Sequence, residues 1–439
     1  MPTLNWIGKE KVVSHHRDVP YRVLEHKYGF TADKGEQTET TNSGNKIIHG
    51  DNLEALKALL PEYEGKIKCV YIDPPYNTGK GGWVYNDNVN HPKIAKWLGE
   101  VVGKEGDDLS RHDKWLCMMY PRLQFLQKLL TEDGIIFISI DDYEYPNLVL
   151  VMNEIFGVRN KIATTIWDLG TGTQAGHFTR AHEYILVYAK SKSMVKNFSG
   201  GEGIIDDRAI KKIGVKNPAS EFTFPKGTKW EAEDGHSLSG EWGGTEKMTL
   251  ISGDMRCKNG QLTDEVTLKA GWTQKTQMEC FFSGEDTYDT KGQKVMEFYF
   301  RTNGKIYCRK ERTIVNPPTV FRKIATTKTG SSEIKALLGS DKFNFPKPSE
   351  LVRYLISLTT KENDIILDSF AGSGTTAHAV LNLNKQDGGN RKFILVEMED
   401  YANDITAERV KRVTKGYGTG AKAVAGTGGA FDFYELGLP

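Results

Sequence analysis

The residues best suited to chemistry form one tetrapeptide, Asp73-Pro74-Pro75-Tyr76, which directly follows the strand-forming run Val70–Ile72. Two adjacent prolines end a strand and fix the backbone around them. The Asp73 carboxylate and the Pro74 carbonyl could each accept one N–H of an exocyclic amino group, which would localise the nitrogen lone pair for attack on an electrophile. The Tyr76 ring could stack on an extruded base. The alternative is a turn that merely ends the strand.

A second motif, LDSFAGSGTT, occupies residues 367–376, much later in the chain. Gly372 and Gly374 permit a tight turn and a close approach of the backbone to a ligand, and the helix expected from Thr375 would direct its N-terminal amides at that ligand. Glu397 ends the next apolar run, where an acidic residue can accept both hydroxyls of a ribose. The alternative for Glu397 is a solvated strand end.

The elements that must position these motifs alternate between apolar strands and amphipathic helices in two regions, 45–190 and 343–412. This alternation predicts a single parallel-rich α/β sheet built from both regions. Its strands are expected near residues 46, 69, 135, 162, 183, 364 and 393. Between these regions, residues 191–342 show only short alternating stretches, which indicate a separate, mainly β or loop-rich insert.

The remaining segments have weaker patterns. Residues 1–44 are expected to be an N-terminal extension, and residues 413–439 a Gly-rich tail that is mobile in its first part. Residues 170–176, GTGTQAG, have the wrong spacing for a dinucleotide loop, and we interpret them as a flexible loop near the active site.

Bulk properties set limits on the class of protein. A length of 439 residues suits two or three domains. The formal net charge of +1 excludes a uniformly basic coat but allows local basic patches. The five cysteines lack the close pairing of a zinc site, so no metal is expected. No apolar window is long enough for a membrane helix, which predicts a soluble, cytoplasmic protein without a membrane partner.

One basic stretch could follow a nucleic-acid backbone, because its cations alternate with Tyr307 and Phe321. The alternative is an ordinary solvated face. The candidate DNA-binding residues are Lys305, Arg309, Lys310, Arg312, Arg322 and Lys323.

The combination of motifs resembles the β class of DNA amino-methyltransferases, in which the catalytic motif precedes the glycine motif and a target-recognition region separates them. The resemblance is closest to the modification subunits of type III restriction systems. It covers roughly residues 45–190 and 343–412 and includes the segments GDNLEALKAL, IDPPYNTG, NTGKGGWVYNDN, WLCMMYPRL, GIIFISIDD, MNEIFG, HEYILVYAKS, FPKPSELV and DSFAGSGTT.

This resemblance implies a seven-stranded, Rossmann-like methyltransferase sheet with a circularly permuted motif order and an inserted target-recognition domain. It implies S-adenosyl-L-methionine as the cofactor. The implied cofactor-binding residues are Asp51, Asn52, Lys347, Pro348, Asp368, Phe370, Gly372, Gly374, Thr375 and Glu397. Asp51 could instead be a plain helix cap, and Lys347 a surface charge.

The implied activity is methylation of the N6 amino group of a flipped-out adenine in double-stranded DNA, with Asp73, Pro74, Pro75 and Tyr76 as catalytic residues. Adenine is favoured because Asp leads the tetrapeptide, where the N4-cytosine enzymes of the family usually have Ser. N4-cytosine methylation and a catalytically inactive DNA-binding module remain the alternatives. The resemblance also allows a homodimer and a restriction subunit with helicase and nuclease activity as partners.

Overall fold

The computed structural model of the chain describes residues 3–78, 84–85, 87–88, 108–199, 206–290, 292–310, 316–322, 324–339 and 343–438. It divides into two compact units. Unit 1 combines Met1–Asn197 with Pro318–Pro439, and unit 2 is Phe198–Pro317. Unit 2 is therefore narrower than the expected insert 191–342, because the segment that follows it contributes a strand and a helix to unit 1.

Unit 1 contains a sheet of eleven strands. All seven expected strands lie in it, which confirms the predicted α/β sheet, but the expected number of seven was too low because four further strands extend its two edges. In spatial order the strands are β2 (Gly35–Gln37), β1 (Val23–Thr31), β26 (Ala430–Gly437), β3 (Lys46–His49), β23 (Lys392–Glu397), β22 (Ile365–Asp368), β4 (Ile67–Ile72), β7 (Leu130–Ile140), β9 (Phe178–Ala189), β8 (Lys161–Ala175) and β21 (Val320–Phe321).

The middle of this sheet is parallel, from β26 through β3, β23, β22 and β4 to β7. From β22 the chain moves to β23, whereas from β4 it moves the other way to β7. The boundary between β22 and β4 is therefore a topological switch point. In sheets of this type, ligands bind outside the carboxyl ends of the strands at such a point.

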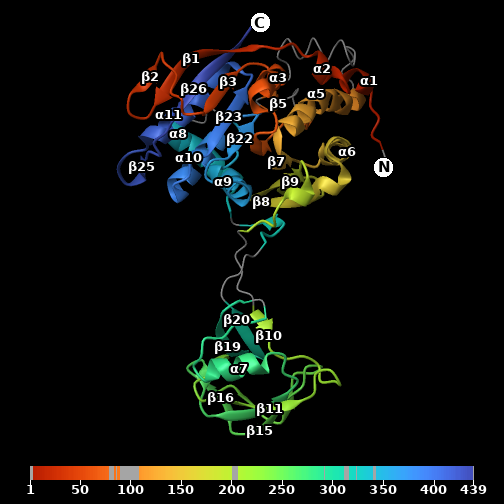
Figure 1. Cartoon of the computed structure of the whole chain (residues 1–439), viewed down its shortest axis with the longest axis vertical. Coiled ribbons are helices and arrows are strands. Elements are labelled where there is room, and N and C mark those ends of the chain that lie inside the picture. The colour runs from red at the N-terminus through yellow and green to blue at the C-terminus, as the bar shows by residue number, and fades with distance from the viewer. Residues whose placement is uncertain are drawn as a thin grey trace. The chain divides into compact units, whose positions relative to one another are not determined.

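Helices cover the sheet in two groups. Right-handed crossovers that run in opposite directions place their helices on opposite faces. One group is α3 (Asn52–Tyr63), α5 (Asp108–Leu129) and α6 (Tyr145–Phe156), with the short α1 (Lys9–Val12) and α2 (His15–Asp18) packed on α5. The other group, which lies together in Figure 1, is α8 (Thr327–Leu338), α9 (Ser349–Thr359), α10 (Thr375–Asp387) and α11 (Glu408–Lys415).

The structure places strands in all three weaker segments and shows that one expectation, the loop at 170–176, was wrong. The end of the Gly-rich tail is β26, which pairs with β3 inside the sheet, and the N-terminal extension supplies β1 as its antiparallel neighbour. Residues 170–175 continue β8 and pair with β9 in a hairpin instead of forming a loop. In each case the pairing partner, rather than the local composition, stabilises the extended backbone.

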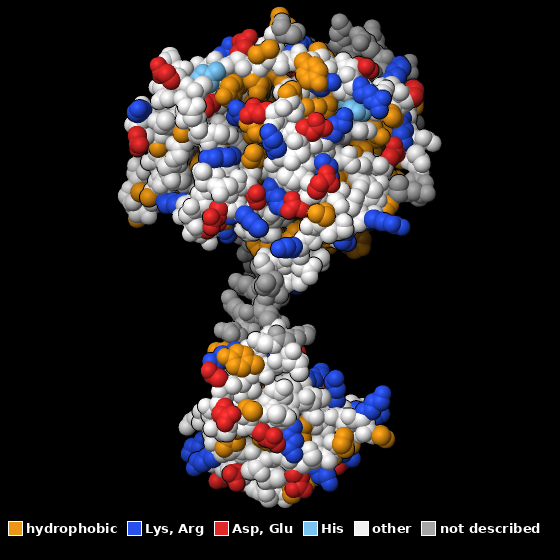
Figure 2. All heavy atoms as spheres, in the orientation of Figure 1, with side chains coloured by type: hydrophobic (Ala, Val, Ile, Leu, Met, Phe, Trp, Pro, Cys, Tyr) orange, Lys and Arg blue, Asp and Glu red, His pale blue; other side chains and the backbone are white. Residues whose placement is uncertain are grey.

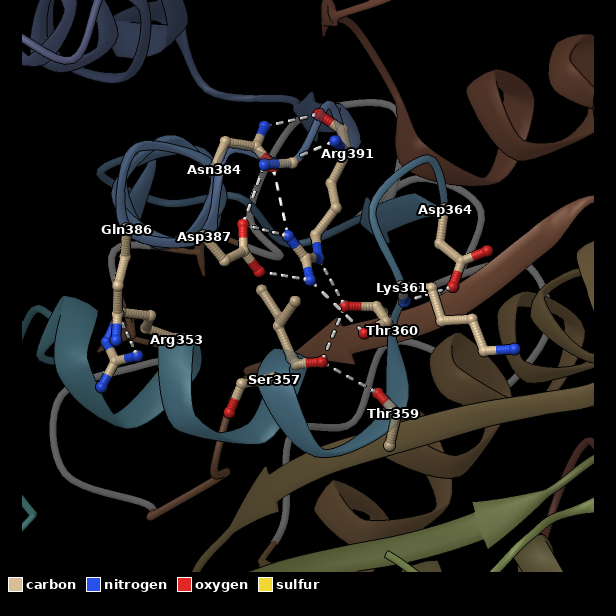
Figure 3. A network of polar contacts seen from close by, with 12 residues as sticks. Arg353, Ser357, Thr359, Thr360, Lys361, Asp364, Asn384, Gln386, Asp387 and Arg391 are labelled. Atoms are coloured by element: carbon tan, nitrogen blue, oxygen red, sulfur yellow. Dashed lines mark hydrogen bonds and ion pairs between the residues drawn. The ribbon is translucent and has the colours of Figure 1, made fainter. Parts of the chain in front are cut away.

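A network of polar contacts joins α9 and α10 to β23 (Figure 3). Arg391, directly before β23, is 5% exposed, and its guanidinium donates to Thr360 after α9 and to Asp387 at the end of α10. Arg353 of α9 also donates to Gln386 of α10 at 2.8 Å. The network fixes the two helices to the strand that follows the Gly motif.

Unit 2 is built on two sheets and one helix, α7 (Lys275–Phe282), around its own apolar core. Fully buried members of this core include Phe224, Trp230 and Phe300. One sheet contains β10 (Asp206–Arg208), β20 (Ile306–Lys310), β19 (Val295–Arg301), β12 (Lys229–Glu231), β17 (Gln261–Leu262), β16 (Met255–Lys258) and β13 (Ser237–Leu238), and the other β11 (Ser220–Phe224), β18 (Val266–Ala270), β15 (Met248–Ser252) and β14 (Glu241–Trp242).

Small elements complete the description: β5 (Val84–Tyr85) pairs with β6 (Asp87–Asn88), and β24 (Gly416–Tyr417) with β25 (Val424–Ala425). Among the described helices, none combines the length and the apolar character that a membrane crossing requires.

Candidate active site

The tetrapeptide and the Gly motif follow neighbouring strands. β4 and β22 are paired in parallel, with Val70 opposite Leu367, so the loops that leave their carboxyl ends emerge side by side at the switch point. The first loop carries Asp73 to Tyr76, and the second carries Ser369 to Gly374. The tertiary structure therefore brings together the two motifs that the sequence separates.

Lys347 joins these loops. Its Nζ donates to Asp73 Oδ2 at 2.8 Å and lies 3.4 Å from Glu183 Oε2, while its backbone carbonyl accepts the Thr375 hydroxyl at 3.1 Å. Although burial disfavours the ammonium, the carboxylates of Asp73 and Glu183 raise the pKa of Lys347 above its ordinary value. Lys347 is thus not a surface charge, and its side chain contacts the tetrapeptide in addition to the Gly motif that its backbone contacts.

Tyr76 is held through both its ring and its hydroxyl. The hydroxyl donates to Glu183 Oε2 at 2.9 Å, and the Lys347 ammonium lies 4.9 Å from the ring centroid, within cation–π range. The carbonyl of Pro75 accepts the Trp115 indole N–H at 2.6 Å, which ties the tetrapeptide to α5. No sequence pattern indicated the role of Glu183, which lies inside an apolar strand.

The residue after the tetrapeptide is also fixed. Asn77 has a positive φ of 57° and donates to the buried Glu144 carboxylate, which accepts from His112 at 2.7 Å and from Asn147 at 2.9 Å as well. Burial raises the pKa of Glu144. These contacts hold the end of the loop that carries the tetrapeptide against α5 and α6. The expected loop continues into residues that lie outside the described part of the chain.

The Gly motif is anchored by Asp368 at the end of β22. Its carboxylate accepts the Phe370 amide at 3.0 Å and the Thr376 hydroxyl at 2.5 Å, and burial raises its pKa to about 7. Gly372 and Gly374 have φ values of 52° and 82°, which favour glycine. A Cβ at Gly374 would lie 3.0 Å from the carbonyl oxygen of Thr406, so the loop also needs glycine for space.

Glu397 lies across this loop, at the end of β23. Its carboxylate accepts the Gly372 amide at 2.7 Å and the Glu399 amide at 3.0 Å. The residue is 5% exposed, so it is not the solvated strand end of the alternative interpretation. Burial raises the pKa of Glu397 to about 8.

Asp51 and Asn52 start α3 beside the same loop. Asp51 caps the helix by accepting the amides of Leu53 and Glu54 at 2.9 and 3.2 Å. Asn52 donates to the carbonyl of Ser369 at 3.0 Å and accepts from the buried guanidinium of Arg122 at 2.5 Å. Asp51 is therefore a helix cap, as the alternative interpretation held. It also lies near the end of β23, a position that is compatible with the expected contact to a cofactor.

Arg409 of α11 is a site residue that the sequence did not reveal. Its fully buried guanidinium donates to the hydroxyls of Ser373 and Thr375 at 2.9 Å and to Glu333 of α8 at 3.2 Å. Glu333 in turn accepts the amide of Ser349, directly after Lys347 and Pro348, at 3.0 Å. Burial lowers the pKa of Arg409 to about 10, so it stays charged at neutral pH.

These groups fit a nucleoside cofactor such as S-adenosyl-L-methionine. The two glycines form a loop whose backbone a ligand can approach, and a buried carboxylate closes each side of it. The hydroxyl of Ser369 is buried and has no hydrogen-bond partner among the described residues. Phe370 packs against the core beside it.

The candidate DNA-binding cations that the structure describes in unit 2 form salt bridges with acidic residues of the same unit. Lys305 pairs with Glu246 at 2.8 Å, Arg309 with Glu297 at 2.8 Å, and the buried Lys310 with Asp289 at 2.9 Å. Arg322 is exposed, and Arg312 and Lys323 lie outside the described residues. On the face seen in Figure 2, the described cations of unit 2 are interspersed with acidic side chains. This arrangement does not support a continuous basic strip.

Comparison with known proteins agrees with the site. A family model for DNA methylases, N6_N4_Mtase, matches residues 67–408. The chain is 33% identical to the EcoPI Mod subunit of a type III restriction-modification enzyme from Escherichia phage P1, over 94% of this chain and 68% of that protein. It is 32% identical to the EcoP15I Mod subunit of Escherichia coli, over 94% of this chain and 69% of that protein.

Among solved structures, a DNA modification methylase of Thermus thermophilus in complex with S-adenosyl-L-methionine aligns with 84% of this chain and 95% of its own, with 15% identity and a TM-score of 0.36. The family model and the two Mod subunits cover the tetrapeptide, the Gly motif and everything between them. The chain belongs to the N6/N4 family of DNA methylases.

Proposed function

We propose that this chain is a site-specific DNA methyltransferase that transfers a methyl group from S-adenosyl-L-methionine to the N6 amino group of a flipped-out adenine. The observation that carries the proposal is that the tetrapeptide and the Gly motif leave paired strands, β4 and β22, at the switch point. Lys347 contacts both, through Asp73 and Thr375.

The tetrapeptide would bind and activate the amino group. Asp73 and the carbonyl of Pro74 would accept hydrogen bonds from its two N–H groups, which moves the nitrogen toward tetrahedral geometry and localises its lone pair for attack on the methyl group. As the N–C bond forms, the S–C bond breaks to leave a neutral thioether, and the methylated nitrogen then releases one proton to solvent. The carbonyl of Pro75 already accepts the Trp115 indole N–H, whereas the proposal uses the carbonyl of Pro74. The Tyr76 ring supports the base, and burial of the site at 5% exposure of Asp73 strengthens each of these interactions.

The Gly motif would hold the cofactor, which supplies a methyl group already activated on a sulfonium. Glu397 would accept the ribose hydroxyls, and Asp51 and Asn52 would face the adenine moiety of the cofactor. The backbone around Gly372 and Gly374, with Asp368, Phe370 and Thr375, would hold the methionine portion. Lys347 and Pro348 close the same side of the loop. The main task of these residues is in-line positioning.

Adenine is the proposed base because an aspartate leads the tetrapeptide. Unit 2 would read the recognition sequence, since it forms a separate body with its own core, inserted between the two halves of the catalytic unit. The Mod subunits among its relatives suggest a restriction-modification system, with a restriction subunit as partner and a homodimer as the working form.

The test is single-molecule sequencing of DNA from a methylation-deficient host that expresses the chain, beside a host that expresses Asp73→Ala. We expect N6-methyladenine at one short sequence motif, and none in the variant. N4-methylcytosine would overturn the choice of base, and no modified base from a folded, cofactor-binding protein would overturn the activity. Retained methylation in Asp73→Ala would overturn the role of the tetrapeptide.

A further inference from the structure

The catalytic carboxylate shares its counterion with a second carboxylate. Lys347 Nζ lies 2.8 Å from Asp73 Oδ2 and 3.4 Å from Glu183 Oε2, so both acids approach the same nitrogen. Both lie in a buried setting, with side chains 7% and 16% exposed. Two carboxylates this close cannot both ionise easily without a cation between them.

The other titratable groups described around this pair are acids, tyrosines and one arginine that pairs with other acids. Asp368 of β22 and Tyr71 of β4 interact with Asp73, and Asp141 at the end of β7 interacts with Glu183. Tyr76 donates its hydroxyl to Glu183. The nearby Arg180 is engaged by Asp141 at 3.1 Å and by Asp142 at 3.6 Å.

We infer that Lys347 is a positioning residue for methyl transfer: it keeps the Asp73 carboxylate ionised, and therefore able to accept an N–H of the target base, against the neighbouring carboxylate of Glu183. The inference rests on the proposed function and adds to it a dependence on pH. A protonated Asp73 would present an O–H donor where the amino group needs an acceptor.

The same geometry gives Glu183 a function. A carboxylate oxygen can accept more than one hydrogen bond, and the Lys347 ammonium has three donors, so the cation can bridge the two acids. When the base places its amino group at Asp73, Lys347 can turn toward Glu183 without losing its charge partner. Glu183 thus holds both the cation and the hydroxyl of the stacking residue Tyr76.

The experiment compares single-turnover methyl transfer across pH for the full chain, Lys347→Met, Glu183→Gln and the double variant, with saturating cofactor and a duplex that contains the recognised site. Methionine matches lysine in length without its charge. We expect the acidic limb of the rate–pH profile of Lys347→Met to lie about one pH unit or more above that of the wild type. At pH values below this limb, the rate of methyl transfer should be about tenfold lower than in the wild type, and it should recover as the pH rises.

Addition of Glu183→Gln removes the competing charge, so the limb of the double variant should move back toward that of the wild type. Lys361→Met, at an exposed lysine of the same unit, is the matched control and should leave the profile unchanged. A loss by the same factor at every pH, or no loss, would overturn the inference. If Lys347→Met does not fold, Lys347→Gln takes its place in the same comparison, and an acidic limb equal to that of the wild type would overturn the inference.

Failure of the proposed function is a separate outcome of the same assay. It would appear as an absence of methyl transfer by the wild-type chain, whereas failure of the inference leaves that transfer intact.

Discussion

At the scale of single residues, the candidate catalytic acid depends on groups from distant parts of the chain. Asp73 follows β4, its cation Lys347 precedes α9, and the second acid Glu183 belongs to β9. An isolated buried carboxylate is costly, and a paired one is stable only while its partner stays in place. The three side chains are therefore expected to respond to mutation as one group.

Tyr76 offers a test of stacking against hydrogen bonding. Tyr76→Ala removes the ring, and since base–aromatic stacking contributes about 1–3 kcal/mol, we expect methyl transfer at low DNA concentration to fall by roughly tenfold to a hundredfold. Tyr76→Phe keeps the ring and loses only the bond to Glu183, so its loss should be much smaller. Steady-state kinetics on a cognate duplex measures both. Equal losses would argue that the hydroxyl, and not the ring, matters.

Glu397 should make cofactor binding depend on pH. Burial raises its pKa to about 8, so near neutrality much of the free protein carries the neutral acid. If the ionised form accepts the ribose hydroxyls, affinity for S-adenosyl-L-methionine should rise with pH and level off above about 8. In Glu397→Gln the affinity should be about tenfold to a hundredfold lower, without this rise. Calorimetric titration across pH measures both effects.

The stability of the cofactor-free protein across pH is a control for the proposed titration of Glu397. The folded state holds this proton more tightly than the unfolded chain, so stability should decline as the pH rises from the ordinary glutamate value toward about 8. Thermal denaturation of Glu397→Gln should show a weaker decline over this interval. A decline as steep as that of the wild type would mean that other groups cause it.

At the scale of elements, Arg409 connects three helices to the Gly motif. From α11 it contacts Ser373 and Thr375 at the start of α10, and it pairs with Glu333 of α8, which also caps α9 through Ser349. The loop expected to bind the cofactor and the segment that carries Lys347 are thus fixed by one buried cation. A substitution that displaces either segment should therefore also displace the other.

Arg409→Met should therefore destabilise the catalytic unit and weaken cofactor binding together. Removal of one partner from a buried ion pair costs about 3–5 kcal/mol, which predicts a clear fall in melting temperature. Arg412→Met is the matched control on the same helix, because the side chain of Arg412 is 44% exposed. Differential scanning calorimetry and cofactor titration measure the two effects. Similar results for both variants would contradict the proposed connection.

At the scale of the whole molecule, the two units have separate hydrophobic cores, so each can unfold as a cooperative body. A ligand that binds only the folded form of unit 1 stabilises that unit by mass action. We expect calorimetry to show two transitions, of which S-adenosyl-L-methionine raises one.

Substitutions in the two cores should assign these transitions. Trp230→Ala, in the core of unit 2, should lower only the transition that the cofactor leaves unchanged, and Leu123→Ala, in the core of unit 1, only the other. Each removes a fully buried side chain and should cost about 2–5 kcal/mol. A single transition that both substitutions lower equally would show that the units unfold together.

The sequence by itself determined the chemistry and most of the sheet. Asp73-Pro74-Pro75-Tyr76 and the Gly372 loop are local signals, because strand ends, proline turns and glycine turns are set by neighbouring residues. The seven expected strands all occur, since each contains a cluster of apolar or β-branched residues. What the two motifs bind remains a proposal.

Only the tertiary structure decided which residues surround these motifs. β26 and the extended part of β8 lack a strong local pattern and are strands because of their partners, which are the distant β3 for β26 and the other arm of its hairpin, β9, for β8. Lys310 belongs to a basic stretch that is typical of nucleic-acid contacts, yet its side chain is buried between two carboxylates. Lys347 and Glu183 meet Asp73 only once β4, β9 and the segment before α9 are assembled, because charge pairing acts through space and leaves no local trace in the sequence.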